Sequence, residues 1–159
     1  MSYFTTLWKN DTWARKCKLA ATGYQQLDYA AASGFKAAGV GSGSTLIVVT
    51  VMKGILYVGG YIEVHGVLNR RDAAKFLGMP DSELWQAEEY AVADRGTTVS
   101  FQENCAVPSA IAQKLEFTKG KGFVNLRFEA HGKLDRQTLR GVRKLAPGSE
   151  LALVSLLKF

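Results

Sequence analysis

The residues of this sequence best suited to ligand chemistry are flat aromatic rings with a polar edge. Six of them stand out: Trp8, Trp13, Tyr24, Tyr29, Trp85 and Tyr90. Rings of this kind stack on nucleic-acid bases where they are exposed, and they fill the core where they are not. The sequence therefore supplies material for a pocket that takes a flat ligand, and it leaves open which rings line that pocket.

Basic residues form the second feature, and most of the excess charge lies in one segment. Between residues 119 and 144 there are eight basic and two acidic residues, which accounts for the net charge of +6 of the whole chain. Arg136, Arg140 and Arg143 recur at helical spacing beside Lys144, so we expect them on one helix face, either solvated or in contact with phosphates. Secondary candidates for phosphate contact are Arg70, Arg71 and the cluster at residues 15–18.

Catalytic and metal-binding motifs are absent from the sequence. The glycine-rich stretch at residues 39–44 leads into a strand and carries no lysine, which favours a turn over a phosphate loop. The two histidines and two cysteines lie far apart, and no nucleophile elbow occurs. Glu88 and Glu89 are neighbours in a predicted strand and so point to opposite faces. We therefore expect no enzyme activity, no metal and no cofactor.

Composition limits the class of protein further. A chain of 159 residues, 47% of them apolar, predicts one folded domain spanning residues 1–159. No apolar run approaches membrane-spanning length, and the N-terminus lacks the order of a secretory signal. Without such a run, we expect no membrane association. Because the sequence has only two cysteines, we expect the protein to work in a reducing cytoplasm.

Local patterns predict the elements that would position these residues. Residues 45–51 and 55–58 form a hairpin through Lys53-Gly54, and Gly59-Gly60 marks a bulge or sharp bend before residues 61–67. Asn69 caps a helix that ends at Gly78, residues 84–93 continue as a strand, and Asp135 and Ser149 each cap a helix. The first 44 residues show a weak helical pattern from Trp13 to Leu19 and little other periodicity, and they are interpreted as irregular. The fold class is α+β: a small, strongly bent β-barrel with short peripheral helices.

The order of these motifs resembles the PUA-like superfamily. The resemblance rests on the strand pair followed by Gly59 to Val64, the Arg-Asp-Ala-Ala helix ending at Leu77-Gly78, Leu84-Trp85-Gln86-Ala87, and the segment from Leu134 to Leu145. The sequence is most similar to the EVE-type modules that accompany HNH nucleases in modification-dependent restriction systems. The resemblance spans nearly the whole chain through short motifs.

The resemblance implies a reader of modified DNA that swings a base out of the duplex into an aromatic pocket. The base would be 5-methylcytosine or a close derivative. Carried over by position, the pocket rings would be Trp8, Trp13, Tyr24, Trp85 and Tyr90. Asp28 or Asp94 would accept a hydrogen bond from the cytosine amino group. Arg136, Arg140, Arg143 and Lys144 would bind the DNA backbone, and a fused or associated nuclease would be the partner.

Three other functions remain open at this stage. The runner-up is a PUA-like module that binds structured or modified RNA, with the rings on unpaired bases. A nucleotide-processing enzyme of the same fold is a third hypothesis, although the sequence offers it no acid–base pair. The fourth is an interaction domain whose basic stripe binds an acidic protein.

Overall fold

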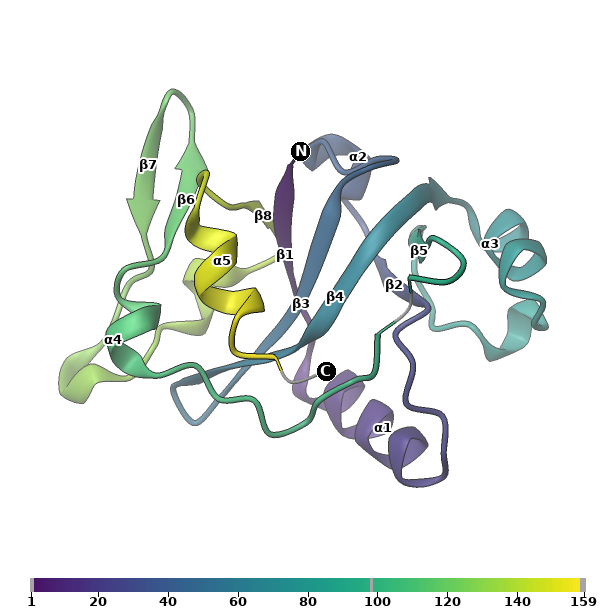
Figure 1. Ribbon diagram of the computed structural model, residues 1–159, viewed down its shortest axis with the longest axis horizontal. Coiled ribbons are helices and arrows are strands. Elements are labelled where there is room, and N and C mark those ends of the chain that lie inside the picture. The colour runs from purple at the N-terminus through teal and green to yellow at the C-terminus, as the bar shows by residue number, and fades with distance from the viewer. Residues whose placement is uncertain (1, 98, 158–159) are drawn as a thin grey trace.

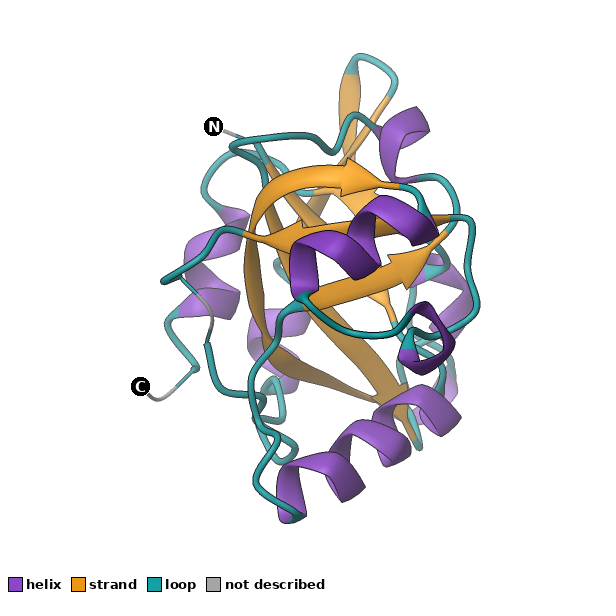
Figure 2. Ribbon diagram, turned by 90° about the vertical axis from the view of Figure 1, so that its right-hand side faces the viewer, coloured by secondary structure: helices purple, strands orange, loops and turns teal. Residues whose placement is uncertain are grey.

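The computed structural model describes residues 2–97 and 99–157. It is an α+β structure in which a strongly curled, mixed six-stranded sheet forms a half-barrel with short helices around it (Figures 1 and 2). This confirms the predicted fold class. The strands are β1 (Tyr3–Leu7), β2 (Tyr29–Ala32), β3 (Thr45–Met52), β4 (Ile55–Leu68), β5 (Glu89–Ala93), β6 (Glu116–Lys119), β7 (Gly122–Asn125) and β8 (Val142–Lys144). The α-helices are α1 (Asn10–Ala21), α2 (Phe35–Ala38), α3 (Arg70–Leu77), α4 (Ser109–Ala112) and α5 (Ser149–Val154), and the 3₁₀ turns are η1 (Asp81–Glu83), η2 (Ala130–Gly132) and η3 (Arg136–Leu139).

The strand order of the main sheet is β2-β5-β4-β3-β1-β8. Strands β1 and β3 pair in parallel, and the other neighbours pair antiparallel. Strands β2 and β8 are therefore the two edges of the half-barrel. Strands β6 and β7 form a separate hairpin, which projects at the upper left of Figure 1.

The β3–β4 hairpin is the centre of the fold, and its prediction is confirmed. Lys53 and Gly54 form the turn, both with positive φ. The register then shifts, because Val48 pairs with Gly60 and Val49 with Val58, which leaves Gly59 as the extra residue of a β-bulge. The predicted bend at the paired glycines is therefore present, and it lets the 14-residue strand β4 curl into the half-barrel.

Aromatic side chains pack directly on the backbone at this bend. A Cβ atom at Gly59 would lie 2.7 Å from Phe101 and 3.0 Å from Trp13, both of which are buried. At Gly60, whose φ is +145°, a Cβ would lie 2.5 Å from Leu27. The glycines thus serve both the curvature of the strand and the close approach of the rings that cover it.

The curled sheet buries both of its faces. Along β3, Ile47, Val49 and Val51 pack with residues from α4, β6 and α5, whereas Leu46 and Val48 face a second cluster rich in aromatic rings. The second cluster includes Phe4, Trp8, Trp13 and Phe101 and lies beneath α1. A third, smaller cluster joins α3 to β5.

Helix α3 has the predicted start and end. The Asn69 side chain accepts a hydrogen bond from the Asp72 backbone N–H at 2.8 Å, and Gly78 ends the helix in the left-handed conformation. The final helix α5 is also present, but its N-cap is Gly148. The predicted cap Ser149 instead accepts a hydrogen bond from the backbone N–H of Glu116.

Two predictions about regular structure are wrong near the cavity described below. The first 44 residues contain β1, α1, β2 and α2 rather than irregular chain, because long-range pairing with β3 and β5 stabilises strands that carry little periodicity of their own. The predicted strand at residues 84–93 is shorter, because only Glu89–Ala93 pairs with neighbours while residues 84–87 run outside the sheet.

The predicted arginine-bearing helix after Asp135 is also wrong. Asp135 does cap a turn, but the turn is the four-residue η3, and the chain then passes through Gly141 at φ +75° into β8. Strand β8 pairs with β1, so the edge of the sheet captures the segment that would otherwise continue the helix. Arg136, Arg140 and Arg143 therefore do not form a single helical stripe.

Two classes of feature are missing from the part of the chain that the structure describes. None of its helices has the length and apolar character needed to cross a bilayer. Nor do three or more His, Cys, Asp or Glu side chains gather there as metal ligands would.

Candidate functional site

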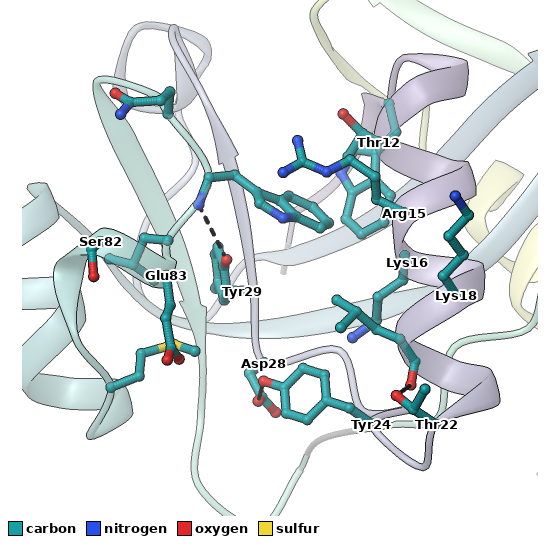
Figure 3. A pocket seen from close by; sticks show the side chains of 16 residues that line it. Thr12, Arg15, Lys16, Lys18, Thr22, Tyr24, Asp28, Tyr29, Ser82 and Glu83 are labelled. Atoms are coloured by element: carbon teal, nitrogen blue, oxygen red, sulfur yellow. Dashed lines mark hydrogen bonds between the residues drawn. The ribbon is translucent and has the colours of Figure 1, made fainter.

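A cavity of about 960 Å³ lies beside α1, and three segments distant in sequence line it. Helix α1 and the residue Trp8 before it form one wall, the residues at 79–86 around η1 form the opposite wall, and the residues leading into β2 lie between them. Figure 3 shows Arg15, Lys16 and Lys18 on one side, Ser82 and Glu83 on the other, and Asp28 and Tyr29 between them. The cavity has the volume of a binding site for a ligand of nucleotide size.

Aromatic rings form a continuous network from the core to this cavity. The Trp8 ring meets the Trp85 ring edge-on at 5.1 Å, and it stacks near Phe101 at 6.1 Å. Trp85 in turn lies 5.8 Å from Tyr29. Trp8 and Phe101 are buried, whereas Trp85 and Tyr29 are half-buried, so the outer rings of a rigid network are the ones offered to a ligand.

The backbone at Trp8 is fixed by two side chains from other elements. The carbonyl oxygen of Trp8 accepts hydrogen bonds from the Thr50 hydroxyl at 2.8 Å and from Arg136 Nη2 at 2.9 Å. Arg136 Nη1 also donates to the Val51 carbonyl and to Asn10 Oδ1. These bonds tie the start of α1 to the β3–β4 hairpin and hold Trp8 at the wall. The Trp8 Nε1 atom is buried and has no hydrogen-bond partner among the described residues.

One end of the cavity is polar and is organised around Tyr24. The Tyr24 hydroxyl donates to Asp28 Oδ2, and Lys16 Nζ lies 4.4 Å from the centre of the same ring. Lys16 Nζ also donates to the Gln26 carbonyl at 2.5 Å, although the Lys16 side chain comes from a buried position on α1. Asp28 is held by its own carbonyl, which accepts from the Ala93 N–H at the end of β5. The Tyr24 side chain thus contacts a cation at its ring face and a carboxylate at its hydroxyl group.

Burial shifts the titration of these groups. It lowers the pKa of Lys16 to about 8, although the charge of Asp28 acts in the opposite direction. Burial, together with the hydrogen bond to Asp28, raises the pKa of Tyr24, and burial raises that of Tyr29. Both phenols therefore keep their protons at neutral pH.

The wall opposite α1 is held by bonds from neighbouring elements. Arg70 of α3 donates through Nε and Nη2 to the Asp81 carbonyl at the start of η1. The Trp85 carbonyl accepts from the Tyr90 hydroxyl, and the Trp85 N–H donates to the Tyr29 oxygen at 3.4 Å. The backbone of Trp85 is therefore held by two tyrosines from β2 and β5.

The predicted pocket residues fall into two groups. Trp8, Tyr24, Asp28 and Trp85 line the cavity. Trp13 and Tyr90 do not line it, because Trp13 covers the bulge in β4 and the fully buried Tyr90 packs under α3. Asp94 also lies outside it and contacts His65 Nδ1 at 3.1 Å, with both side chains about half exposed.

The predicted backbone-binding residues do not gather at the cavity. Arg136 is bonded to three groups of the chain itself, as described above. Arg143 donates to the Thr138 carbonyl, and its guanidinium carbon lies 5.2 Å from the Phe117 ring. Arg140 and Lys144 are exposed at the β8 edge, opposite the β2 edge. Arg70 fastens η1, and Arg71 is exposed on α3.

Twelve of the sixteen lining residues were not predicted for the pocket itself, and four of these twelve are aromatic or basic. Tyr29 was predicted only as one of the six polar-edged rings, and Arg15, Lys16 and Lys18 only as part of a secondary basic cluster. For Arg15 and Lys16 the signal in the sequence is their spacing from Thr12 and Leu19, which follows one face of a helix.

In comparisons with known proteins, no family model, curated protein or solved structure matches the chain.

Proposed function

We propose that this protein is a non-catalytic reader of modified DNA that takes an extruded cytosine base into the cavity between α1 and η1. One observation carries the proposal: a single cavity combines half-buried rings, a positioned carboxylate and a basic rim. The proposal agrees with the resemblance to EVE-type modules, from which Trp8, Tyr24, Asp28 and Trp85 were predicted as pocket residues. A nuclease, fused or associated, would supply the cleavage of a modification-dependent restriction system.

The aromatic wall suits a base that has left its stack. Trp85 and Tyr29 present rings to the cavity, and the buried Trp8 backs Trp85 edge-on. Extruding a base costs a few kcal/mol of pairing and stacking, and stacking on a protein ring recovers roughly 1 to 3 kcal/mol per base. The rings can therefore offset most of the cost, and polar contacts must provide the rest together with the selectivity.

Asp28 is the group that suits the edge of cytosine. One of its oxygens accepts a hydrogen bond from the Tyr24 hydroxyl, which helps to hold the carboxylate at the cavity wall. An ionised carboxylate accepts hydrogen bonds and does not donate them, so it favours the amino group of cytosine over the carbonyl group that thymine carries at the same ring position.

The rim of α1 supplies the contacts to the backbone. Arg15 and Lys18 are exposed, line the cavity and lie on the helix that forms its wall. Each phosphate that such a side chain neutralises makes the decrease of log K with log salt concentration steeper, by roughly 0.9 on duplex DNA. We therefore propose that the docking surface lies on α1 instead of on the segment at residues 119–144.

The test compares two aspartates that were equal candidates in the sequence. Duplexes that differ at a single cytosine, plain or modified, are titrated against the wild type, Asp28→Asn and Asp94→Asn at two salt concentrations. We expect Asp28→Asn to weaken binding of the modified duplex by roughly 10- to 150-fold, since hydrogen bonds to charged groups contribute about 1.5 to 3 kcal/mol. Asp94→Asn is the control and should bind like the wild type.

The same titration can refute the proposal. Equal affinity of the wild type for modified and plain duplexes would show that no base is read. Stronger binding to a matched RNA than to either DNA duplex would show that the protein is an RNA-binding module and not a reader of modified DNA.

A further inference from the structure

Lys16 is the buried cation of the cavity, and it shares Tyr24 with Asp28. Lys16 is 4% exposed, and its Nζ lies 4.4 Å from the centre of the Tyr24 ring. The Tyr24 hydroxyl donates a hydrogen bond to Asp28. Figure 3 shows Lys16 reaching from α1 toward Tyr24 and Asp28. A hydrogen bond to the Gln26 carbonyl at 2.5 Å keeps the ammonium in this place. A ligand group beside Asp28 therefore meets a fixed cation.

The chemistry of cytosine links Asp28 to the position of the modification. The amino group is attached to ring carbon 4, and the substituent at carbon 5 is its direct neighbour on the same edge. A base that donates its amino group to Asp28 therefore presents its carbon 5 substituent next to that contact. In this cavity the Asp28 carboxylate accepts a hydrogen bond from the Tyr24 phenol, and its charge acts on the Lys16 ammonium, and both of these groups are polar.

We propose that the cavity selects a cytosine whose carbon 5 substituent carries oxygen (hydroxymethyl, formyl or carboxyl) over one that carries only methyl, with Lys16 donating a hydrogen bond to that oxygen. This inference rests on the proposed function and specifies its ligand. A methyl group in this place would cover part of a buried ammonium with a group that cannot accept its hydrogen bond, which is unfavourable. An oxygen acceptor satisfies it, and a carboxylate also supplies the opposite charge.

A binding series tests the selectivity. Duplexes carry plain, methyl, hydroxymethyl or carboxyl cytosine at one position, and each is titrated against the wild type, Lys16→Met and Lys18→Met. We expect the wild type to bind the hydroxymethyl and carboxyl duplexes at least tenfold more tightly than the methyl duplex. Lys16→Met should reduce that difference to less than threefold. Lys18→Met removes an exposed cation from the same helix, so it should weaken all four duplexes alike.

Chemical trapping tests the same contact on the wild type, without depending on how a variant folds. The neutral Lys16 amine, present in quantity at pH 8 because burial lowers its pKa to about 8, attacks the carbon of a formyl group. The carbonyl oxygen takes up protons and leaves as water, which gives an imine. Cyanoborohydride then transfers hydride to the imine carbon, and a proton from water completes a secondary amine.

The expected product is a stable protein–DNA adduct with the formyl duplex, mapped to Lys16 by peptide mass. The methyl duplex has no carbonyl group and serves as the control. Tighter binding of the methyl duplex than of both oxidised duplexes, or an adduct at another lysine, would overturn the inference and leave the proposed function standing. If no modified duplex is distinguished from the plain one and Asp28→Asn has no effect, the proposed function itself fails.

Discussion

The buried ammonium of Lys16 destabilises the folded protein at neutral pH, and its replacement by methionine should reveal this directly. Burial lowers the pKa of Lys16 from 10.5 to about 8. Between these two values the unfolded chain keeps its proton on Lys16 while the folded protein has lost it. The contribution of Lys16 to the free energy of unfolding therefore rises as the pH rises through that range.

The size of the effect follows from the shift. One pKa unit corresponds to about 1.36 kcal/mol, so a change from 10.5 to about 8 sets an upper limit of about 3 kcal/mol. The cavity is open to solvent, which screens the charge, and we expect about 1 to 2 kcal/mol. The free energy of unfolding of Lys16→Met minus that of the wild type should thus be larger at pH 7 than at pH 10.5. The increase should be about 1 to 2 kcal/mol.

The assay is urea unfolding of the wild type, Lys16→Met and Lys18→Met at several pH values from 7 to 10.5. Burial raises the pKa of Tyr24 and Tyr29, and that of Cys17 to about 11. Stability from these three groups falls with rising pH, but all three are present in each protein and largely cancel in the differences. The free energy of unfolding of Lys18→Met should change with pH as that of the wild type does. If Lys16→Met also shows the pH dependence of the wild type, the Lys16 ammonium is not desolvated and the reasoning about the cavity is wrong.

Other predictions concern separate parts of the structure. Trp85→Ala should weaken binding of the modified duplex by roughly 5- to 150-fold in fluorescence anisotropy, as expected for the loss of about 1 to 3 kcal/mol of base stacking; unchanged affinity would remove this ring from the site. Arg136→Ala should lower the free energy of unfolding by about 2 to 4 kcal/mol, because it leaves three acceptors without their charged donor, and the salt dependence of binding should not change. Arg15→Ala should instead reduce the salt slope by about 0.9 with little effect on stability. Gly59→Ala should destabilise the protein by about 1 to 3 kcal/mol in thermal unfolding, because its Cβ would lie 2.7 Å from Phe101.

Sequence patterns were reliable where the structure depends on neighbours in the chain. The β3–β4 turn, the Asn69 cap and the glycine bulge all arise from interactions over a few residues, and all were predicted. The predicted arginine helix is absent, because the segment forms strand β8, which pairs with β1 at the other end of the chain. Strands β1 and β2 in the first 44 residues were missed for the same reason, since they pair with β3 and β5.

The candidate site divides in the same way. Its residue types could be chosen from the sequence, since aromatic rings and carboxylates are what a base pocket requires, and Trp8, Tyr24, Asp28 and Trp85 line one cavity. Asp28 could not be told from Asp94 in the sequence, because the difference lies in the partner of each: a tyrosine inside the cavity for one and His65 outside it for the other.

The sequence by itself determined the class of fold, the bend in the central strand and the supply of rings and charges. The tertiary structure alone decided which rings line the cavity and which fill the core, since that depends on the curl of the sheet and on the position of α1. It also directed Arg136 into the fold and left Arg15 and Lys18 at the rim. Local patterns record the preferences of a segment, whereas a binding site is made where segments distant in sequence are brought together by the burial of their apolar faces.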